Sequence, residues 1–182
     1  MKPVSTLLMI SLLSLPHLVG AEGFTLTSPD IAGQLSNKEV FNGFGCSGEN
    51  ISPALNWSNA PEGTKSFALT VYDKDAPTGS GWWHWLVFDL PADTNGLKSN
   101  AGNLEKDLAP KGSIQSITSF GQAGFGGACP PEGHPPHQYV FTVYALKVDK
   151  LGIDASAMPS LVGYYLNANV LAKASVIAYY AR

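Results

Sequence analysis

Two segments of the sequence gather side chains that could bind a charged ligand, and each leads from a turn-rich loop into an expected strand. One contains Asp73 and Asp75 and continues to His84, and the other leads to His137 and Tyr139. Imidazoles and hydroxyls donate hydrogen bonds to anionic oxygens, and a carboxylate can orient an imidazole or meet an amine. We expect both histidines to donate to an anion, Asp73 to orient a histidine or meet an amine, and Tyr139 to cap the anion. Such a pocket suits a small anionic or zwitterionic ligand, such as a phosphate ester that carries an amine.

The glycine- and proline-rich loop before the second histidine supplies the expected walls of this pocket. The backbone N–H groups of Gly126 and Gly127 could add contacts to an anion, whereas Pro130 and Pro131 form a stiff wall without N–H donors. His134 lies in a proline-rich stretch of the same loop, and we expect it to be solvated.

Catalytic chemistry fits these residues less well. Asp73, Asp75, His84 and His137 could bind zinc, so a metal-assisted hydrolase is a weaker hypothesis, but the sequence has neither H-E-x-x-H nor C-x-x-C. It also has no G-x-S-x-G nucleophile motif and no G-x-x-x-x-G-K-[ST] phosphate loop. We therefore expect a non-enzymatic protein that uses no metal or other cofactor.

A different interpretation takes the tryptophan-rich segment 81–85 as a contact surface. It contains Trp82, Trp83 and Trp85, and exposed tryptophan is enriched in protein interfaces. In this alternative the chain is an interaction or inhibitor module for a periplasmic or extracellular partner, and the pocket is vestigial. Each motif taken singly is also common in purely structural roles, because Asp-x-Asp-x-Pro often forms only a turn and neighbouring tryptophans often pack in a core.

The composition fits a single folded domain. Of the 182 residues, 45% are hydrophobic and only 14% are charged, which excludes an intrinsically disordered chain. The formal net charge of -3 argues against nucleic-acid binding, which requires a basic surface. The 19 glycines and 13 prolines indicate many turns and loops.

Residues 1–21 have the pattern of a secretory signal peptide. Lys2 gives a positive start, the apolar stretch 7–19 is too short to span a membrane comfortably, and small residues end at Ala21. We expect cleavage after Ala21, a single mature domain at 22–182, and a periplasmic or secreted location without a transmembrane anchor. Export would also permit a disulfide between Cys46 and Cys129, the alternative being two free buried thiols.

The rest of the sequence alternates in the manner of β-strands more often than it shows helical periodicity. Strands are expected at 24–28, 66–72, 84–90, 138–146 and 174–180, and a helix at 154–167. Asp154 or Ser156 would cap this helix, with Pro159 in its first turn. The helical residues expected to face the sheet are Leu161, Tyr164 and Tyr165.

These elements suggest how the chemical groups could meet. Strand 138–146 is apolar on both faces and is therefore expected inside the sheet. If the strands near His84 and His137 are neighbours, both histidines lie at one edge of the sheet, and Asp73 can reach the same edge from the end of strand 66–72. The loops at 73–81 and 121–136 would then form the walls of one pocket.

Several motifs follow one another at spacings typical of one family. They are Asn-Ile-Ser-Pro-Ala-Leu-Asn-Trp at 50–57, Tyr-Asp-Lys-Asp-Ala-Pro at 72–77, Trp-His-Trp at 83–85, and Gly-Gly-Ala-Cys-Pro-Pro at 126–131 with His-Gln-Tyr at 137–139. Together they resemble the phosphatidylethanolamine-binding protein family, also called the Raf kinase inhibitor protein family. The resemblance is greatest to its exported bacterial YbhB/YbcL-like branch and covers nearly all of the mature chain.

The resemblance implies a mainly β fold, in which a large central antiparallel sheet packs against a smaller sheet, with a flanking C-terminal helix. It also implies an anion pocket at one end of the large sheet, of a kind associated with phosphate-containing head groups and phosphorylated peptides. Members are generally binders or inhibitors rather than enzymes, and bacterial relatives are often dimers, so the resemblance also raises a homodimer. Carried over by motif position, the pocket residues are Asp73, Asp75, Pro77, His84, Pro130, Pro131, His137 and Tyr139.

The sequence departs from the family pattern beside these motifs. Lys74 replaces a common proline between the two aspartates, Ala128 replaces a frequent proline, and Gln138 replaces the arginine that usually follows the loop histidine. Loss of that arginine removes a cation near the pocket and argues against strong affinity for phosphate. The segment 134–136 is also longer than the family pattern, which affects the expected depth of the pocket.

Overall fold

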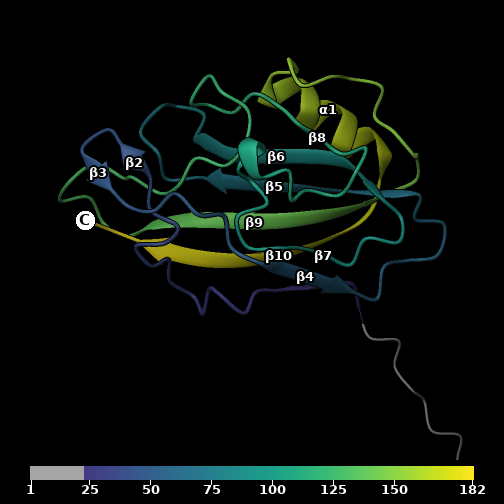
Figure 1. The fold of residues 1–182 in the computed structure, drawn as a ribbon, viewed down its shortest axis with the longest axis horizontal. Coiled ribbons are helices and arrows are strands. Elements are labelled where there is room, and N and C mark those ends of the chain that lie inside the picture. Colours follow the sequence, from purple (N-terminus) through teal and green to yellow (C-terminus); the bar gives the residue numbers. More distant parts are fainter. Residues whose placement is uncertain (1–22) are drawn as a thin grey trace, which may run out of the picture.

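The computed structural model describes residues 23–182, which form three antiparallel sheets and a helix near the C-terminus (Figure 1). The expected signal peptide at 1–21 lies outside the described residues. In chain order the elements are β1 (Thr25–Thr27), β2 (Asn42–Gly43), β3 (Cys46–Ser47), β4 (Leu55–Ser58), β5 (Ser66–Asp73), β6 (Trp82–Pro91), β7 (Gly96–Leu97), a 3-10 turn (Leu104–Lys106), β8 (Ile114–Gln115), β9 (His137–Leu146), α1 (Pro159–Asn169) and β10 (Val170–Tyr180).

The largest sheet has five antiparallel strands in the order β10-β9-β5-β6-β8, and a three-stranded sheet has the order β1-β4-β7. Figure 1 shows α1 on one side of the large sheet and β4 and β7 on the other. One core cluster, which includes Val71 and Phe141, packs against Trp57 of the smaller sheet, and a second includes Phe88 of β6 and Leu166 of α1. Because both faces are covered, the central strands are apolar almost throughout. The predicted fold class is confirmed.

Three strands begin or end at the same edge of the large sheet, the edge that is formed by strand ends. Asp73 ends β5, and it pairs in register with Trp82 of β6 on one side and with Tyr139 of β9 on the other. The strands that carry His84 and His137 are therefore not direct neighbours, because β5 lies between them. Antiparallel pairing nevertheless brings the end of β5 and the starts of β6 and β9 to the same edge.

The helix differs from the prediction in both its start and its buried face. Pro159 occupies the first turn as expected, but the cap position is Met158, and the Asp154 side chain accepts a hydrogen bond from the Ser156 N–H in a preceding turn. Its buried residues are Val162 and Leu166, whereas Leu161 is 44% and Tyr164 70% exposed, and only Tyr165 packs partly against the core. The prediction that Leu161 and Tyr164 face the sheet is wrong, because the apolar pattern of this segment is consistent with more than one face.

The expected final strand also begins earlier than predicted, since β10 follows α1 directly and starts at Val170. Among residues 23–182, no helix is both long enough and apolar enough to cross a membrane.

Candidate binding site

A cavity of about 170 Å³ opens at the edge where β5, β6 and β9 meet. At about 30 Å³ per liquid water, this is the room of about five or six waters. The predicted residues that line it are Asp73, Pro77, His84, Pro130, Pro131, His137 and Tyr139. Two other predicted residues, Asp75 and Gly127, do not line it.

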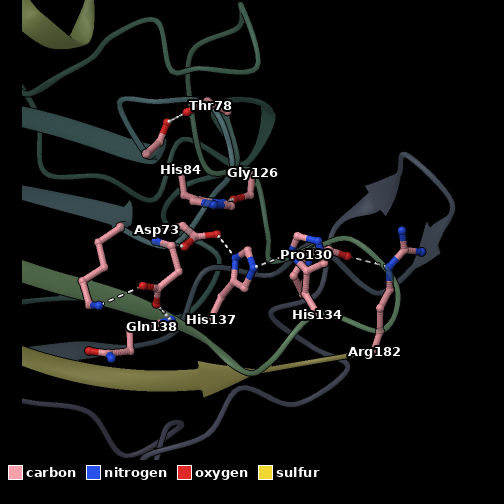
Figure 2. Close-up of polar contacts among 12 residues, drawn as sticks. Asp73, Thr78, His84, Gly126, Pro130, His134, His137, Gln138 and Arg182 are labelled. Carbon is pink, nitrogen blue, oxygen red and sulfur yellow. Dashed lines mark hydrogen bonds and ion pairs between the residues drawn. The ribbon is translucent and has the colours of Figure 1, made fainter.

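Asp73 and His137 form a buried pair in this cavity. The Nδ1 atom of His137 lies 2.7 Å from Oδ2 of Asp73, and both side chains are 4% exposed. The second carboxylate oxygen of Asp73 accepts a hydrogen bond from the backbone N–H of Asp75 at 2.9 Å. Asp73 therefore holds the His137 ring in one orientation, with Nδ1–H directed at the carboxylate (Figure 2).

The other ring nitrogen of His137 faces a second histidine. Its Nε2 atom lies 3.3 Å from Nδ1 of His134, and Figure 2 shows the two rings side by side. The prediction that His134 is solvated is wrong in this respect, because His134 is half-buried and contacts the pocket histidine. This contact places the His134 ring beside the start of β9, while Pro135 and Pro136 are exposed.

His84 is held by the loop on the opposite side of the cavity. Its Nδ1 atom lies 2.7 Å from the carbonyl oxygen of Gly126, and since a carbonyl only accepts, Nδ1 carries the hydrogen. Its Nε2 atom is buried and has no hydrogen-bond partner among the described residues. Burial lowers the pKa of His84 to about 4, so the imidazole is neutral near pH 7.

Tyr139 packs its ring against that of His84, with 5.2 Å between the ring centroids. Its hydroxyl is also buried and is without a partner in the described part of the chain. Burial, together with the negative charge of Asp73, raises the pKa of Tyr139, so the hydroxyl keeps its hydrogen as a donor. His84 and Tyr139 thus each have a buried polar atom without a partner among the described residues, and both residues line the same cavity.

The expected backbone donors of the glycine loop are used within the chain. The N–H of Gly126 donates to the His84 carbonyl at 2.9 Å, and the N–H of Gly127 donates to Oδ1 of Asn50 at 2.7 Å. A Cβ atom at Gly127 would approach the carbonyl oxygen of Glu39 to 2.3 Å. The glycine there permits close packing of two backbone segments, and the prediction that these N–H groups face an anion is wrong.

Asp75 links the loop after β5 to the start of β9, outside the cavity. Its Oδ1 atom lies 2.8 Å from Nζ of Lys74, and its Oδ2 atom accepts the backbone N–H of Gln138 at 2.8 Å. The hydrogen bond to Lys74 lowers the pKa of Asp75, with a further contribution from the Gln138 N–H. Asp75 therefore fixes the loop after β5 to the start of β9.

Further side chains that were not predicted as pocket residues, several of them aromatic, complete its wall. The additional lining residues are Phe44, Ala76, Thr78, Trp82, Phe120 and Cys129. The Phe120 ring stacks on Phe44 at 5.8 Å and meets the Trp82 ring edge-on at 5.3 Å. The predicted disulfide could have indicated Phe44, because a bond from Cys46 to Cys129 brings the residues next to Cys46 close to the pocket loop.

The tryptophans at 82–85 form the start of β6 rather than a loop. Trp85 is fully buried and donates its Nε1–H to Gln115 at 2.7 Å, while Trp82 and Trp83 are half-buried. The expectation of an exposed tryptophan surface is therefore wrong for Trp85.

A disulfide fastens the pocket loop to the rest of the molecule. Cys46 of β3 is bonded to Cys129, which confirms the predicted pairing. Beside it, Arg182 donates from Nε to the Pro130 carbonyl at 2.7 Å (Figure 2). Its guanidinium also donates to the Gly45 carbonyl at 3.1 Å. The C-terminal residue thus bridges the same two segments as the disulfide.

Within residues 23–182, no group of three or more His, Cys, Asp or Glu side chains is placed to hold a metal ion. Asp73 and Asp75 instead bind His137, Lys74 and backbone N–H groups.

The low pKa of His84 predicts that the protein loses stability in acid. The unfolded chain takes up this proton near pH 6.5 but the native protein only near pH 4, so stability is full above 6.5 and falls as the pH drops toward 4. The difference between these two pKa values corresponds to a loss of about 3 kcal/mol in the free energy of unfolding, at about 1.4 kcal/mol per pH unit. Urea unfolding of wild type and His84→Gln between pH 7 and pH 4 should show this extra loss in wild type only, and parallel curves would contradict it.

Comparison with known proteins supports the family suggested by the motifs. The model of the phosphatidylethanolamine-binding protein family matches residues 31–181. The chain is 52% identical over 162 residues to the UPF0098 protein YbcL of Escherichia coli K12, covering 88% of each chain. It is 47% identical over 148 residues to YbhB of the same organism, covering 81% of this chain and 92% of YbhB.

Solved structures agree with this relationship. The crystal structure of Escherichia coli YbcL, described as a new member of the mammalian PEBP family, has a TM-score of 0.86 and covers 88% of this chain and 99% of its own. The homolog CT736 of Chlamydia trachomatis, at 26% identity, has a TM-score of 0.72 and covers 88% of this chain and 98% of its own. The family model, the identity to YbcL and the shared structure show that this chain belongs to the phosphatidylethanolamine-binding protein family.

Proposed function

We propose that this protein is an exported, non-enzymatic binding protein for a small anionic or zwitterionic ligand of the phosphate-ester kind. The observation that carries the proposal is the small cavity in which the Asp73–His137 pair faces His84 and Tyr139. Two buried polar atoms there have no partner within residues 23–182, and such atoms are normally paired with protein, water or a ligand. Membership of the family supports a binding role.

The size and polarity of the cavity fit a zwitterionic head group. A carboxylate that is already paired with a histidine can still attract an ammonium group, while the Tyr139 hydroxyl can donate to a phosphate oxygen. The rings of Phe44, Trp82 and Phe120 line the wall beside these contacts and add apolar surface to the cavity. A periplasmic or secreted location, reached through the signal peptide at 1–21, belongs to the same proposal.

Calorimetric titration with phosphoethanolamine tests the proposal. We expect binding to the wild-type protein and at least about tenfold weaker binding to His84→Ala, since the variant removes a polar contact inside a buried site. Tyr164→Ala is the matched control, because Tyr164 lies on the exposed face of α1 and should leave the affinity unchanged. Equal heats with wild type and His84→Ala, or no heat with either, would refute this function.

An interaction module for a periplasmic or extracellular protein is the second candidate, and the exposure of Phe44 favours it. Phe44 is 69% exposed at the cavity wall, and exposed aromatic residues are enriched at interfaces. In that case Phe44→Ala would abolish capture of the partner while His84→Ala would retain it. The homodimer raised by the family resemblance is tested by light scattering of the purified protein.

A further inference from the structure

The cavity offers few hydrogen-bond donors to a bound anion. His84 uses Nδ1–H for the Gly126 carbonyl, and His137 directs Nδ1–H to Asp73. The Nε2 atom of His137 faces His134 rather than an unoccupied position. The N–H groups of Gly126 and Gly127 are likewise satisfied by other parts of the chain.

The two unpaired polar atoms have opposite roles. In neutral His84, a hydrogen on Nδ1 leaves Nε2 as a lone-pair acceptor, so this buried atom can only receive a hydrogen bond. The Tyr139 hydroxyl can donate, and it is only 1% exposed. Asp73 adds a carboxylate, and the residues that line the cavity include neither lysine nor arginine.

We propose that the cavity recognises an O–H group on the ligand, so that a phosphate ester binds as its monoanion, with P–O–H donating to Nε2 of His84 and Tyr139 donating to an unprotonated oxygen. This inference rests on the proposed function and states which protonation form of that ligand the site takes. The groups that face the ligand are Asp73, His84, His137 and Tyr139, with His134 behind His137.

The physical reason is that placing a ligand acceptor against the acceptor Nε2 of His84 costs free energy, because no hydrogen lies between them. A phosphate dianion or a sulfate has only lone pairs to turn toward Nε2 of His84, and its charge also lies next to the Asp73 carboxylate. Sites built to hydrogen-bond a ligand O–H reject analogues that lack it, because a buried polar atom is then left without a partner. The site should therefore separate two ligands that differ only in this hydrogen.

Phosphoethanolamine and ethanolamine O-sulfate make such a pair at pH 5. The second pKa of a phosphate ester is about 6, so at pH 5 both ligands carry one negative charge and one ammonium group, but only the phosphate has an O–H. Both ligands meet the same Asp73, His134 and His137 side chains, so these groups do not distinguish between them. We expect calorimetry to show about 10- to 100-fold tighter binding of phosphoethanolamine.

His84→Gln assigns the effect to one atom. A glutamine amide can turn its NH₂ donor toward the ligand, so the preference should fall to less than about threefold in this variant and persist in the exposed-face control Tyr164→Ala. The nitrogen-15 shift of His84 Nε2 in the phosphoethanolamine complex should remain that of a neutral, hydrogen-accepting nitrogen.

The outcomes separate the two proposals. Equal or tighter binding of ethanolamine O-sulfate by wild type would overturn the O–H requirement and leave the proposed function intact. An unchanged preference in His84→Gln would overturn the assignment to His84. Absence of binding by both ligands would overturn the proposed function together with this inference.

Discussion

Replacing both Cys46 and Cys129 by alanine is expected to lower the free energy of unfolding by about 4 to 5 kcal/mol. The bridge joins positions 83 residues apart, so its removal releases a long loop in the unfolded chain and raises the conformational entropy of that state. Urea unfolding followed by tryptophan fluorescence measures the difference. The double substitution is preferred because a single one would leave a reactive thiol.

Reduction of the wild-type protein provides an independent route to the same state. Its unfolding midpoint should fall to that of the double variant, whereas the double variant itself should not respond to reductant. Because Cys129 lines the cavity, loss of the bridge should also weaken the binding of phosphoethanolamine, the test ligand of the proposed function. An unchanged midpoint in wild type whose two thiols have been shown to be reduced would contradict the expected stabilisation.

The position of the site could be predicted from the sequence because it depends on where strands end. Apolar alternation located β5, β6 and β9 to within two residues, and antiparallel pairing then places Asp73, His84 and His137 at one edge. The condition that the two histidine strands are neighbours is not met, since β5 separates them. Strand order depends on contacts between distant segments, which periodicity does not encode.

The helix shows the limit of pattern reading for a segment with apolar residues on several faces. Leu161 and Val162 are adjacent and both apolar, yet only Val162 is buried. Packing against the large sheet decides which face of the helix is buried, and Val162 joins the cluster that contains Phe88 and Ala68. Local propensity alone could not decide between them.

The chemical groups of the site could be predicted, but their hydrogen-bonding states could not. The sequence contains the two histidines and the glycine loop, but not the fact that Asn50 satisfies Gly127 or that Gly126 accepts from His84. These partners lie 77 and 42 residues away in the chain. They leave Nε2 of His84 as an acceptor, where the sequence predicted a donor.

The second large effect is expected at the buried Asp73–His137 pair. Asp73→Ala should lower the free energy of unfolding by about 3 to 5 kcal/mol, because it leaves the His137 Nδ1–H and the Asp75 N–H without their acceptor. Urea unfolding at pH 7 measures the loss. Asp93→Ala is the matched control, since Asp93 is exposed and its removal should change stability by no more than about 0.5 kcal/mol.

A double-mutant cycle shows whether the loss comes from the pair or from the aspartate alone. His137→Phe removes the donor, so Asp73→Ala combined with it should cost about 1 to 3 kcal/mol less than the sum of the two single variants. Strict additivity would show that the two side chains are not energetically coupled despite the 2.7 Å contact. Asp73→Asn refines the result, because its amide keeps one acceptor for His137 but turns a donor toward the Asp75 N–H. An intermediate loss in that variant would mean that both oxygens of Asp73 hold the cavity in shape, which is the condition for His84 and Tyr139 to meet a ligand from fixed positions.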